Sequence, residues 1–195
     1  MNIFNIERAF RWKKERDWDT LYWMIDVHNT ILEGKYTNDQ DLTPSDDAIE
    51  VLKWITDRED QKIIIWTSSY AEHFERLKKH YFDNFGIVLD FHNSNPECGN
   101  IGYADFTNKP YFNILLDDKA CFEPDSDWKL IKDELIRIGE WEIEAKYFYI
   151  IGASTKEIIG ACTQDSIDDI LSEEPPETQF QEISREEFRK YVDAN

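Results

Sequence analysis

The sequence predicts an α/β fold: a Rossmann-like three-layer sandwich around a mainly parallel sheet, followed by a small C-terminal β-hairpin and tail. Short apolar runs alternate with longer segments of helical periodicity, the order expected when crossover helices join parallel strands. Several of these runs end in acidic or hydroxyl side chains, as buried strands do at a ligand-binding edge. The chain has 195 residues, which suits one such domain with a small addition.

The first elements are predicted in the order arm, strand, helix. Residues 1–19 are rich in Arg, Lys and Trp and predict an N-terminal arm or helix over the core. The run LYWMID, residues 21–26, is short, apolar and closed by an acid, which predicts a buried strand. In residues 46–60 apolar side chains recur at helical spacing behind Ser45, a residue type that caps helices. This pattern predicts the first crossover helix.

A second strand and helix follow. Residues 62–69, KIIIWTSS, predict the strand, and residues 71–86 predict a helix that Gly86 ends. Residues 87–91 predict a short strand. Residues 92–108 then predict a loop, whose length is typical of functional or mobile segments.

The last core elements are a strand and a helix. Residues 111–122, YFNILLDDKACF, predict a third strong strand, again with acids near its end. Residues 127–141 predict a helix with Leu130, Leu135 and Ile138 on one side and charged residues on the other.

A change in composition divides the chain into a core, residues 1–145, and a C-terminal element, residues 146–195. In the C-terminal element, residues 147–163 predict two short strands joined by a turn. The remainder is acidic, and Ser184 followed three residues later by Glu187 predicts a terminal helix with a capping box.

Composition restricts the possible functions. The net charge of -19 repels phosphate backbones, so general nucleic-acid binding is not expected. The three cysteines form no CxxC pair and indicate neither a disulfide framework nor a zinc site. There is no apolar signal region and no run near the ~18 apolar residues of a membrane span, so we expect a cytoplasmic protein without a membrane partner.

Carboxylates follow two of the predicted strands. Asp26 closes the first strand, and Asp117 and Asp118 close the third. The carboxyl ends of parallel strands share one edge of the sheet, so these groups should gather there. Clustered carboxylates repel one another, and a divalent cation with oxygen ligands offsets the repulsion; Mg²⁺ is the usual ion where phosphate is also bound. The sequence therefore predicts a metal site.

The same edge offers the parts needed for phosphoryl transfer, which are a nucleophile, a cation and donors for the charge on the phosphoryl oxygens. Asp26 can attack, and Asp118 can hold the metal. Thr67 at the end of the second strand can donate a hydroxyl, and Lys109 can supply positive charge.

Three segments resemble the four motifs of the haloacid-dehalogenase-like hydrolases. IDVHNTIL resembles the first motif, DxDxT, and IIIWTSS resembles the second, a strand that ends in Thr or Ser. In NKPYFNILLDDKA, Lys109 matches the third motif, and Asp117 with Asp118 matches the fourth. The compact arrangement is similar to that of small phosphatase-like members with a minimal cap, some of them phage-encoded.

The resemblance implies Mg²⁺-dependent hydrolysis of phosphomonoesters through an aspartyl-phosphate on Asp26. The implied metal ligands are Asp26, the main-chain carbonyl of His28 and Asp118, with Asp117 beside them. The implied substrate-binding residues are Asn29, Thr30, Ser68 and Lys109. The implied pocket is largely open, which suits a phosphorylated small molecule or an accessible phosphate end of a larger molecule.

One position departs from the family pattern. Phosphatases of this kind usually carry a second aspartate two residues after the nucleophile, and here that residue is His28. An imidazole, with an ordinary pKa of ~6.5, can protonate a leaving alkoxide and then deprotonate water. The alternative is a catalytically weak member that binds a protein partner through its acidic C-terminal element. Phosphoryl transfer to an acceptor other than water also stays open.

Overall fold

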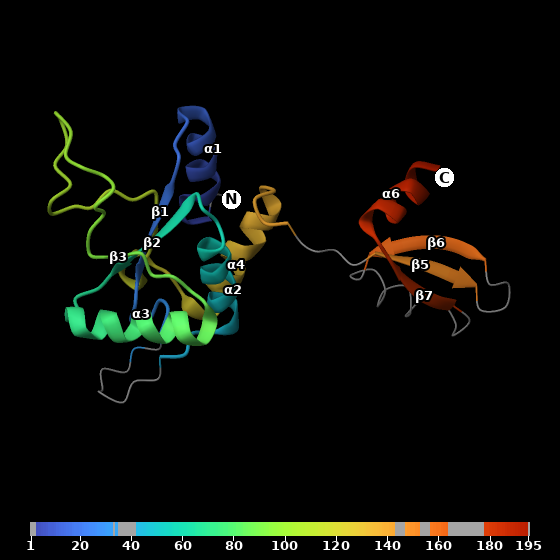
Figure 1. Cartoon of the computed structure of the whole chain (residues 1–195), viewed down its shortest axis with the longest axis horizontal. Helices are drawn as coiled ribbons and strands as arrows, with labels where there is room; N and C mark the ends of the chain where they lie inside the picture. The colour runs from blue at the N-terminus through green and yellow to red at the C-terminus, as the bar shows by residue number, and fades with distance from the viewer. Residues whose placement is uncertain are drawn as a thin grey trace. The chain divides into compact units, whose positions relative to one another are not determined.

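The computed structural model describes residues 3–32, 34, 42–142, 147–152, 157–163 and 178–194. The chain forms two compact units, Met1–Trp141 and Glu142–Asn195. The first unit contains a parallel sheet flanked by helices, and the second contains a small antiparallel sheet (Figure 1). The predicted Rossmann-like α/β class is confirmed.

The sheet of the first unit has four parallel strands in the order β3-β2-β1-β4 (Figure 1). These strands are β1 (Leu21–Asp26), β2 (Gln61–Trp66), β3 (Phe91–His92) and β4 (Ile114–Leu116). The chain runs outward from β1 to β3 and then returns to the other side of β1. Where strand order reverses in this way, a crevice opens outside the carboxyl ends of the two strands, here β1 and β4.

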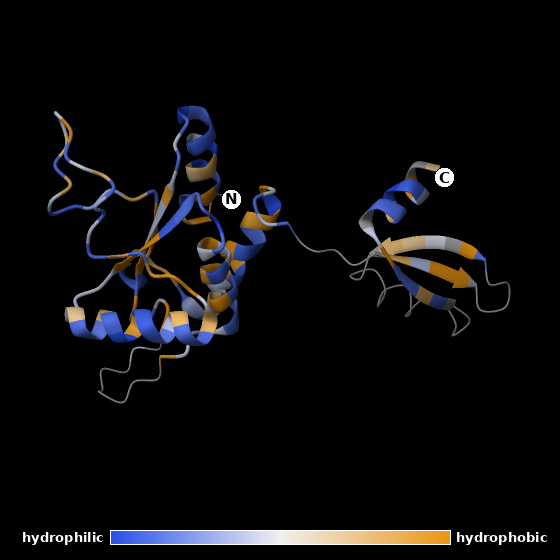
Figure 2. Ribbon diagram, viewed as in Figure 1, coloured by the Kyte–Doolittle hydropathy of each residue, from blue (hydrophilic) through white to orange (hydrophobic). Residues whose placement is uncertain are grey.

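The helices of the first unit form where the sequence predicts apolar faces and caps. They are η1 (Ile3–Asn5), α1 (Ile6–Arg16), α2 (Asp46–Thr56), α3 (Ala71–Phe85), η2 (Asp118–Ala120) and α4 (Pro124–Arg137). Ser45 caps α2, because its hydroxyl accepts a hydrogen bond from the Ala48 amide at 3.3 Å. In Figure 2 the ribbons of α2 and α3 alternate between hydrophilic and hydrophobic stretches, as helices with one buried face do. None of the helices in the described ranges is long and apolar enough to cross a membrane.

Two separate cores lie on the two faces of the sheet, because successive side chains of a strand point to opposite faces. On one face Trp23 and Ile65 are fully buried in a core that includes residues of α1, α2, α3 and α4. On the other face Met24 and Ile64 pack against the long segment between β3 and β4, including Phe112. This irregular segment therefore forms the third layer of the fold.

The strand expected over residues 87–91 is shorter than predicted, since only its last residue lies in β3. The side chain of Asp90 explains the late start. Its carboxylate accepts a hydrogen bond from the Ile63 amide at 2.9 Å, so a side chain takes the place of a backbone carbonyl beside β2.

The final core helix begins earlier than predicted, at Pro124. Of the three residues predicted on its apolar side, Leu135 is buried and Ile138 packs against the core. The buried apolar residues of the helix are Trp128, Ile131 and Leu135. Leu130, expected to face the core, is 41% exposed. Trp128 is buried in the core, and its indole nitrogen donates a hydrogen bond to the Thr30 carbonyl at 2.9 Å.

The second unit contains β5 (Tyr147–Gly152), β6 (Ile158–Thr163), β7 (Thr178–Ile183) and α6 (Arg185–Ala194). Strands β5 and β6 form the predicted antiparallel pair, and the turn predicted between them lies outside the described residues. The capping box is also present: Ser184 and Glu187 each accept a hydrogen bond from the other's amide. Strand β7, which pairs with β5, was not predicted.

Gly86 gives a test of the α3 terminus. It adopts a left-handed φ of 67°, and a β carbon built there would meet nothing closer than 4.0 Å. The cost of a side chain is therefore conformational, and Gly86→Ala should lower the free energy of unfolding in urea by ~1 kcal/mol. Gly99→Ala is the matched control, because a β carbon there meets no atom within 4 Å and the residue has no positive φ. Equal losses in the two variants would contradict the left-handed cap.

Candidate functional site

Three carboxylates meet at the carboxyl edge of β1 and β4. Asp26 is the last residue of β1, and Asp117 and Asp118 directly follow β4. One oxygen of each lies within 4.8 Å of the corresponding oxygens of the other two. The structure thus brings together the three acids that the sequence singles out, at the crevice where the strand order reverses.

A tight turn after β1 arranges the residues that support these acids. The amides of Ile31 and Leu32 donate hydrogen bonds to the Val27 carbonyl at 3.0 and 2.9 Å, and the Asn29 amide donates to the Leu32 carbonyl at 2.7 Å. Asn29 adopts a left-handed φ of 59°, a conformation that asparagine tolerates better than most residues. The turn brings the Thr30 hydroxyl close to Asp26 and Asp118.

Thr30, which the motif resemblance assigns to substrate binding, lies close to Asp26 and Asp118. Its side chain is fully buried and is not among the lining residues of the acid pocket described below. Its hydroxyl accepts a hydrogen bond from the Asp118 amide at 3.1 Å and lies 3.5 Å from an Asp26 carboxylate oxygen as a donor. The indole nitrogen of Trp128 donates a hydrogen bond to the Thr30 carbonyl. One buried threonine therefore connects the two strand ends.

Burial raises the pKa of Asp26, and the neighbouring carboxylates of Asp117 and Asp118 raise it further. The Val27 amide and the positive form of His28 act in the opposite direction. Because the folded-state pKa is raised, the ionised group opposes folding at pH values above the ordinary range of an aspartate. A cation placed among the three acids would remove this cost.

Asp118 lies in a different electrostatic setting. The Lys119 ammonium forms an ion pair with its carboxylate, and Asn29 donates a hydrogen bond to the same oxygen at 3.3 Å. These contacts lower the pKa of Asp118, with Lys119 as the larger cause. Asp117 accepts a hydrogen bond from the Lys119 amide at 2.8 Å and so caps η2. The pair of acids after β4 is therefore held in place by its own backbone turn.

The acids line an open pocket whose other walls include His28, Ser68 and Thr67. Thr67 is held by Asn93, which accepts a hydrogen bond from the Thr67 amide at 2.8 Å and donates one to the Thr67 carbonyl at 2.6 Å. Sequence reasoning missed Asn93. Asn93 directly follows β3 and adopts a left-handed φ of 51°, a conformation that asparagine tolerates. An asparagine at the end of a predicted strand is the sequence signal that could have identified it.

The lysine of the pocket is Lys119 rather than the predicted Lys109. Lys119 lines the pocket beside the acids, whereas Lys109 is exposed and lines a separate cavity with Tyr111 and Phe112. The loop before β4 reaches the acid pocket through Thr107 and Asn108, and it turns away from the pocket at the next residue. The direction of a side chain in such a loop depends on tertiary contacts that the motif spacing does not encode.

The arrangement suits a hard cation together with a small oxyanion: carboxylate oxygens for the first, and hydroxyl and ammonium donors for the second. No family model, no curated protein and no solved structure matches the chain in comparisons with known proteins. The geometry of the pocket and the fold are therefore the grounds on which a function is assigned.

The connecting role of Thr30 can be tested with an isosteric substitution. Thr30→Val keeps the side-chain volume but leaves the Asp118 amide without its acceptor, so we expect the free energy of unfolding to fall by ~1–2 kcal/mol in a urea titration. Thr20→Val is the control, since its hydroxyl makes no hydrogen bond within the described part of the chain. A Thr30→Val loss no larger than that of the control would show that the hydroxyl is dispensable.

Proposed function

We propose that the chain is a Mg²⁺-dependent phosphomonoester hydrolase with the chemistry of the haloacid-dehalogenase-like enzymes. One observation carries the proposal: Asp26, Asp117 and Asp118, from the ends of two neighbouring parallel strands, converge within 4.8 Å. The pocket around them also contains Thr67 and Lys119, a hydroxyl and an ammonium suited to phosphoryl oxygens. The resemblance of three sequence segments to the four family motifs supports the same proposal.

The donor set fits Mg²⁺. Three carboxylates are hard oxygen ligands. Burial raises the pKa of Asp26 most and the neighbouring carboxylates raise it further, and a divalent cation would favour the ionised form of Asp26. Asp26 and Asp118 would hold the ion, with Asp117 beside them. When bound, Mg²⁺ neutralises charge on the phosphoryl oxygens and polarises the phosphorus centre.

The proposed reaction has two balanced steps. In the first, a carboxylate oxygen of Asp26 forms a bond to phosphorus while the bond to the ester oxygen breaks, and protonated His28 gives its proton to the leaving oxygen. In the second, His28 takes a proton from water, the water oxygen forms a bond to phosphorus, and the bond to Asp26 breaks. Phosphate leaves, and Asp26 and protonated His28 are regenerated.

The remaining pocket residues stabilise charge and position the phosphoryl group. Thr67 offers its hydroxyl from the end of β2, where Asn93 fixes the backbone on both sides of the residue. Ser68 lies next to it in the pocket wall. Lys119 supplies positive charge while its ion pair with Asp118 keeps its ammonium at the acids. Donors held in advance in this way lower the barrier without reorganisation during the reaction.

Asp26→Asn tests the nucleophile. Wild-type protein should release phosphate from small phosphomonoesters in the presence of Mg²⁺ and not after chelation, and the variant should lose at least ~10³-fold in kcat because an amide cannot replace the attacking carboxylate. Mg²⁺ should also raise the thermal midpoint of the wild type more than that of the variant. Asp83→Asn, which removes an exposed acid of α3 outside the pocket, is the control for both measurements.

Full activity of Asp26→Asn would refute the nucleophile assignment. A Mg²⁺-dependent thermal shift without turnover on any ester would instead favour the second hypothesis, a binding protein that keeps the metal site, and a pull-down that depends on the C-terminal element would then identify its partner.

The two lysines can be separated by matched substitutions. We expect Lys119→Gln to lower kcat/KM for a phosphomonoester by ~10-fold or more, because an ammonium next to the phosphoryl group is lost. Lys109→Gln should change kcat/KM by less than ~2-fold, since Lys109 lines another cavity. Steady-state kinetics at saturating Mg²⁺ gives both values. The opposite ranking would restore Lys109 to the role that the motif resemblance implies.

A further inference from the structure

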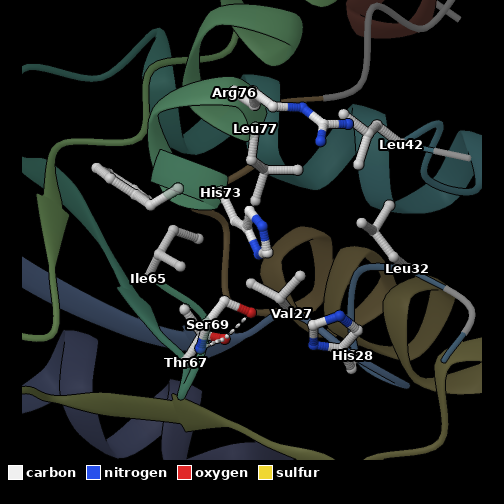
Figure 3. Close-up of a pocket in the computed structure, with 11 residues that line it drawn as sticks. Val27, His28, Leu32, Leu42, Ile65, Thr67, Ser69, His73, Arg76 and Leu77 are labelled. Carbon is white, nitrogen blue, oxygen red and sulfur yellow. Dashed lines mark hydrogen bonds between the residues drawn. The ribbon is translucent and has the colours of Figure 1, made fainter. Parts of the chain in front are cut away.

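A second cavity, mostly apolar, adjoins the acid pocket. Its apolar lining residues are Val27, Leu32, Leu42, Ile65, Phe74 and Leu77 (Figure 3). They come from the turn after β1, from the end of β2, from the segment before α2, and from the first half of α3. The two-step reaction proposed above gives the apolar walls of this cavity no role.

The two cavities adjoin at two residues. His28 and Thr67 line both of them. In Figure 3 the His28 ring lies at one side of the apolar cavity, with Val27 between it and the side chain of His73. The apolar cavity is therefore the compartment next to a phosphoryl group placed at Asp26, on the His28 side. His28, the proposed proton donor to the leaving oxygen, marks the side on which the leaving group must lie.

The cavity is also lined by charged and polar side chains of α3. His73 and Arg76 lie one helical turn apart, both are exposed, and both contribute to the lining. In Figure 3 the Arg76 guanidinium extends toward Leu42, across the cavity from Thr67 and Ser69. Arg76 makes no ion pair with any residue in the described part of the chain. In a chain of net charge -19, a guanidinium in this position favours an anionic group locally.

We infer that this cavity is the leaving-group subsite of the proposed hydrolase, and that it takes a compact apolar group, such as a phenyl ring, with a carboxylate on the side away from the phosphate. The inference rests on the proposed function. The cavity holds about 70 Å³, so its apolar walls contact part of the ring, and a polyhydroxylated leaving group would lose hydration against these walls. The carboxylate pairs with Arg76.

Three phosphate esters that differ in the leaving group test the subsite by steady-state kinetics. They are 4-carboxyphenyl phosphate, phenyl phosphate and glycerol phosphate. We expect kcat/KM to decrease in that order. Arg76→Gln should lower kcat/KM for the carboxylated ester by ~5-fold, the effect of one partly solvated charge pair, and leave the phenyl ester unchanged. Lys79→Gln removes one charge from the same helix outside the cavity and is the matched control.

A binding experiment separates the subsite from the hydrolase proposal. The probe is 4-carboxyphenylphosphonate, which cannot be hydrolysed, and its dissociation constant is measured by calorimetry with Mg²⁺ present. His73→Trp, an exposed substitution that fills the cavity, should weaken binding of this probe and leave binding of inorganic phosphate unchanged. If no ester is hydrolysed but the probe binds with dependence on Arg76, the hydrolase proposal and the leaving-group role both fail, and the cavity stands only as a binding site for the carboxylated ring.

Two outcomes would overturn the subsite while the hydrolase proposal survives. The first is hydrolysis of glycerol phosphate as efficiently as of the carboxylated ester, with no effect of Arg76→Gln. The second is probe binding that neither Arg76→Gln nor His73→Trp weakens. Neither substitution alters a buried residue, so both variants should fold.

Discussion

Mutual repulsion of three carboxylates is the constraint around which the first unit is built. Asp26, Asp117 and Asp118 lie within 4.8 Å of one another. Burial, and after it the neighbouring carboxylates, raise the pKa of Asp26, so its ionised form opposes folding. Parallel pairing of β1 with β4 and the buried contacts of Thr30 hold the acids at this separation. Functional sites commonly hold like-charged side chains close together in a crevice, at a cost in folding stability.

The irregular segment between β3 and β4 takes part in the same construction. It covers a sheet face that parallel α/β folds generally cover with helices, and asparagine side chains satisfy backbone groups that a helix would satisfy itself. Asn113 accepts a hydrogen bond from the Tyr22 amide at 2.9 Å, and Asn95 donates one to the Tyr111 carbonyl at 2.9 Å. Fixed to the sheet in this way, the segment delivers Thr107 to the pocket.

The sequence was sufficient to predict the sheet and the positions of the acids, because both depend on local patterns. Asp26 terminates an apolar run, and chain order and parallel pairing place such termini at one edge. It was insufficient wherever a side chain's direction depends on distant packing. The path of the loop before β4 leaves Lys109 at another cavity, and Lys119 lines the acid pocket. In the last core helix the large Trp128 side chain is buried, whereas Leu130 is exposed. Strand β7 has too few apolar residues to be recognised without its partner β5.

His28 and Thr67 form a wall common to two cavities, and this sharing limits how the protein can diverge. In the proposed mechanism, replacement of either residue would alter proton transfer or charge stabilisation and also the shape of the neighbouring cavity. Positions on α3 such as His73 line only the apolar compartment. Descendants with new preferences would accordingly accumulate changes along this helix, while the β1 terminus stays constant, so that reactivity and selectivity evolve on separate elements.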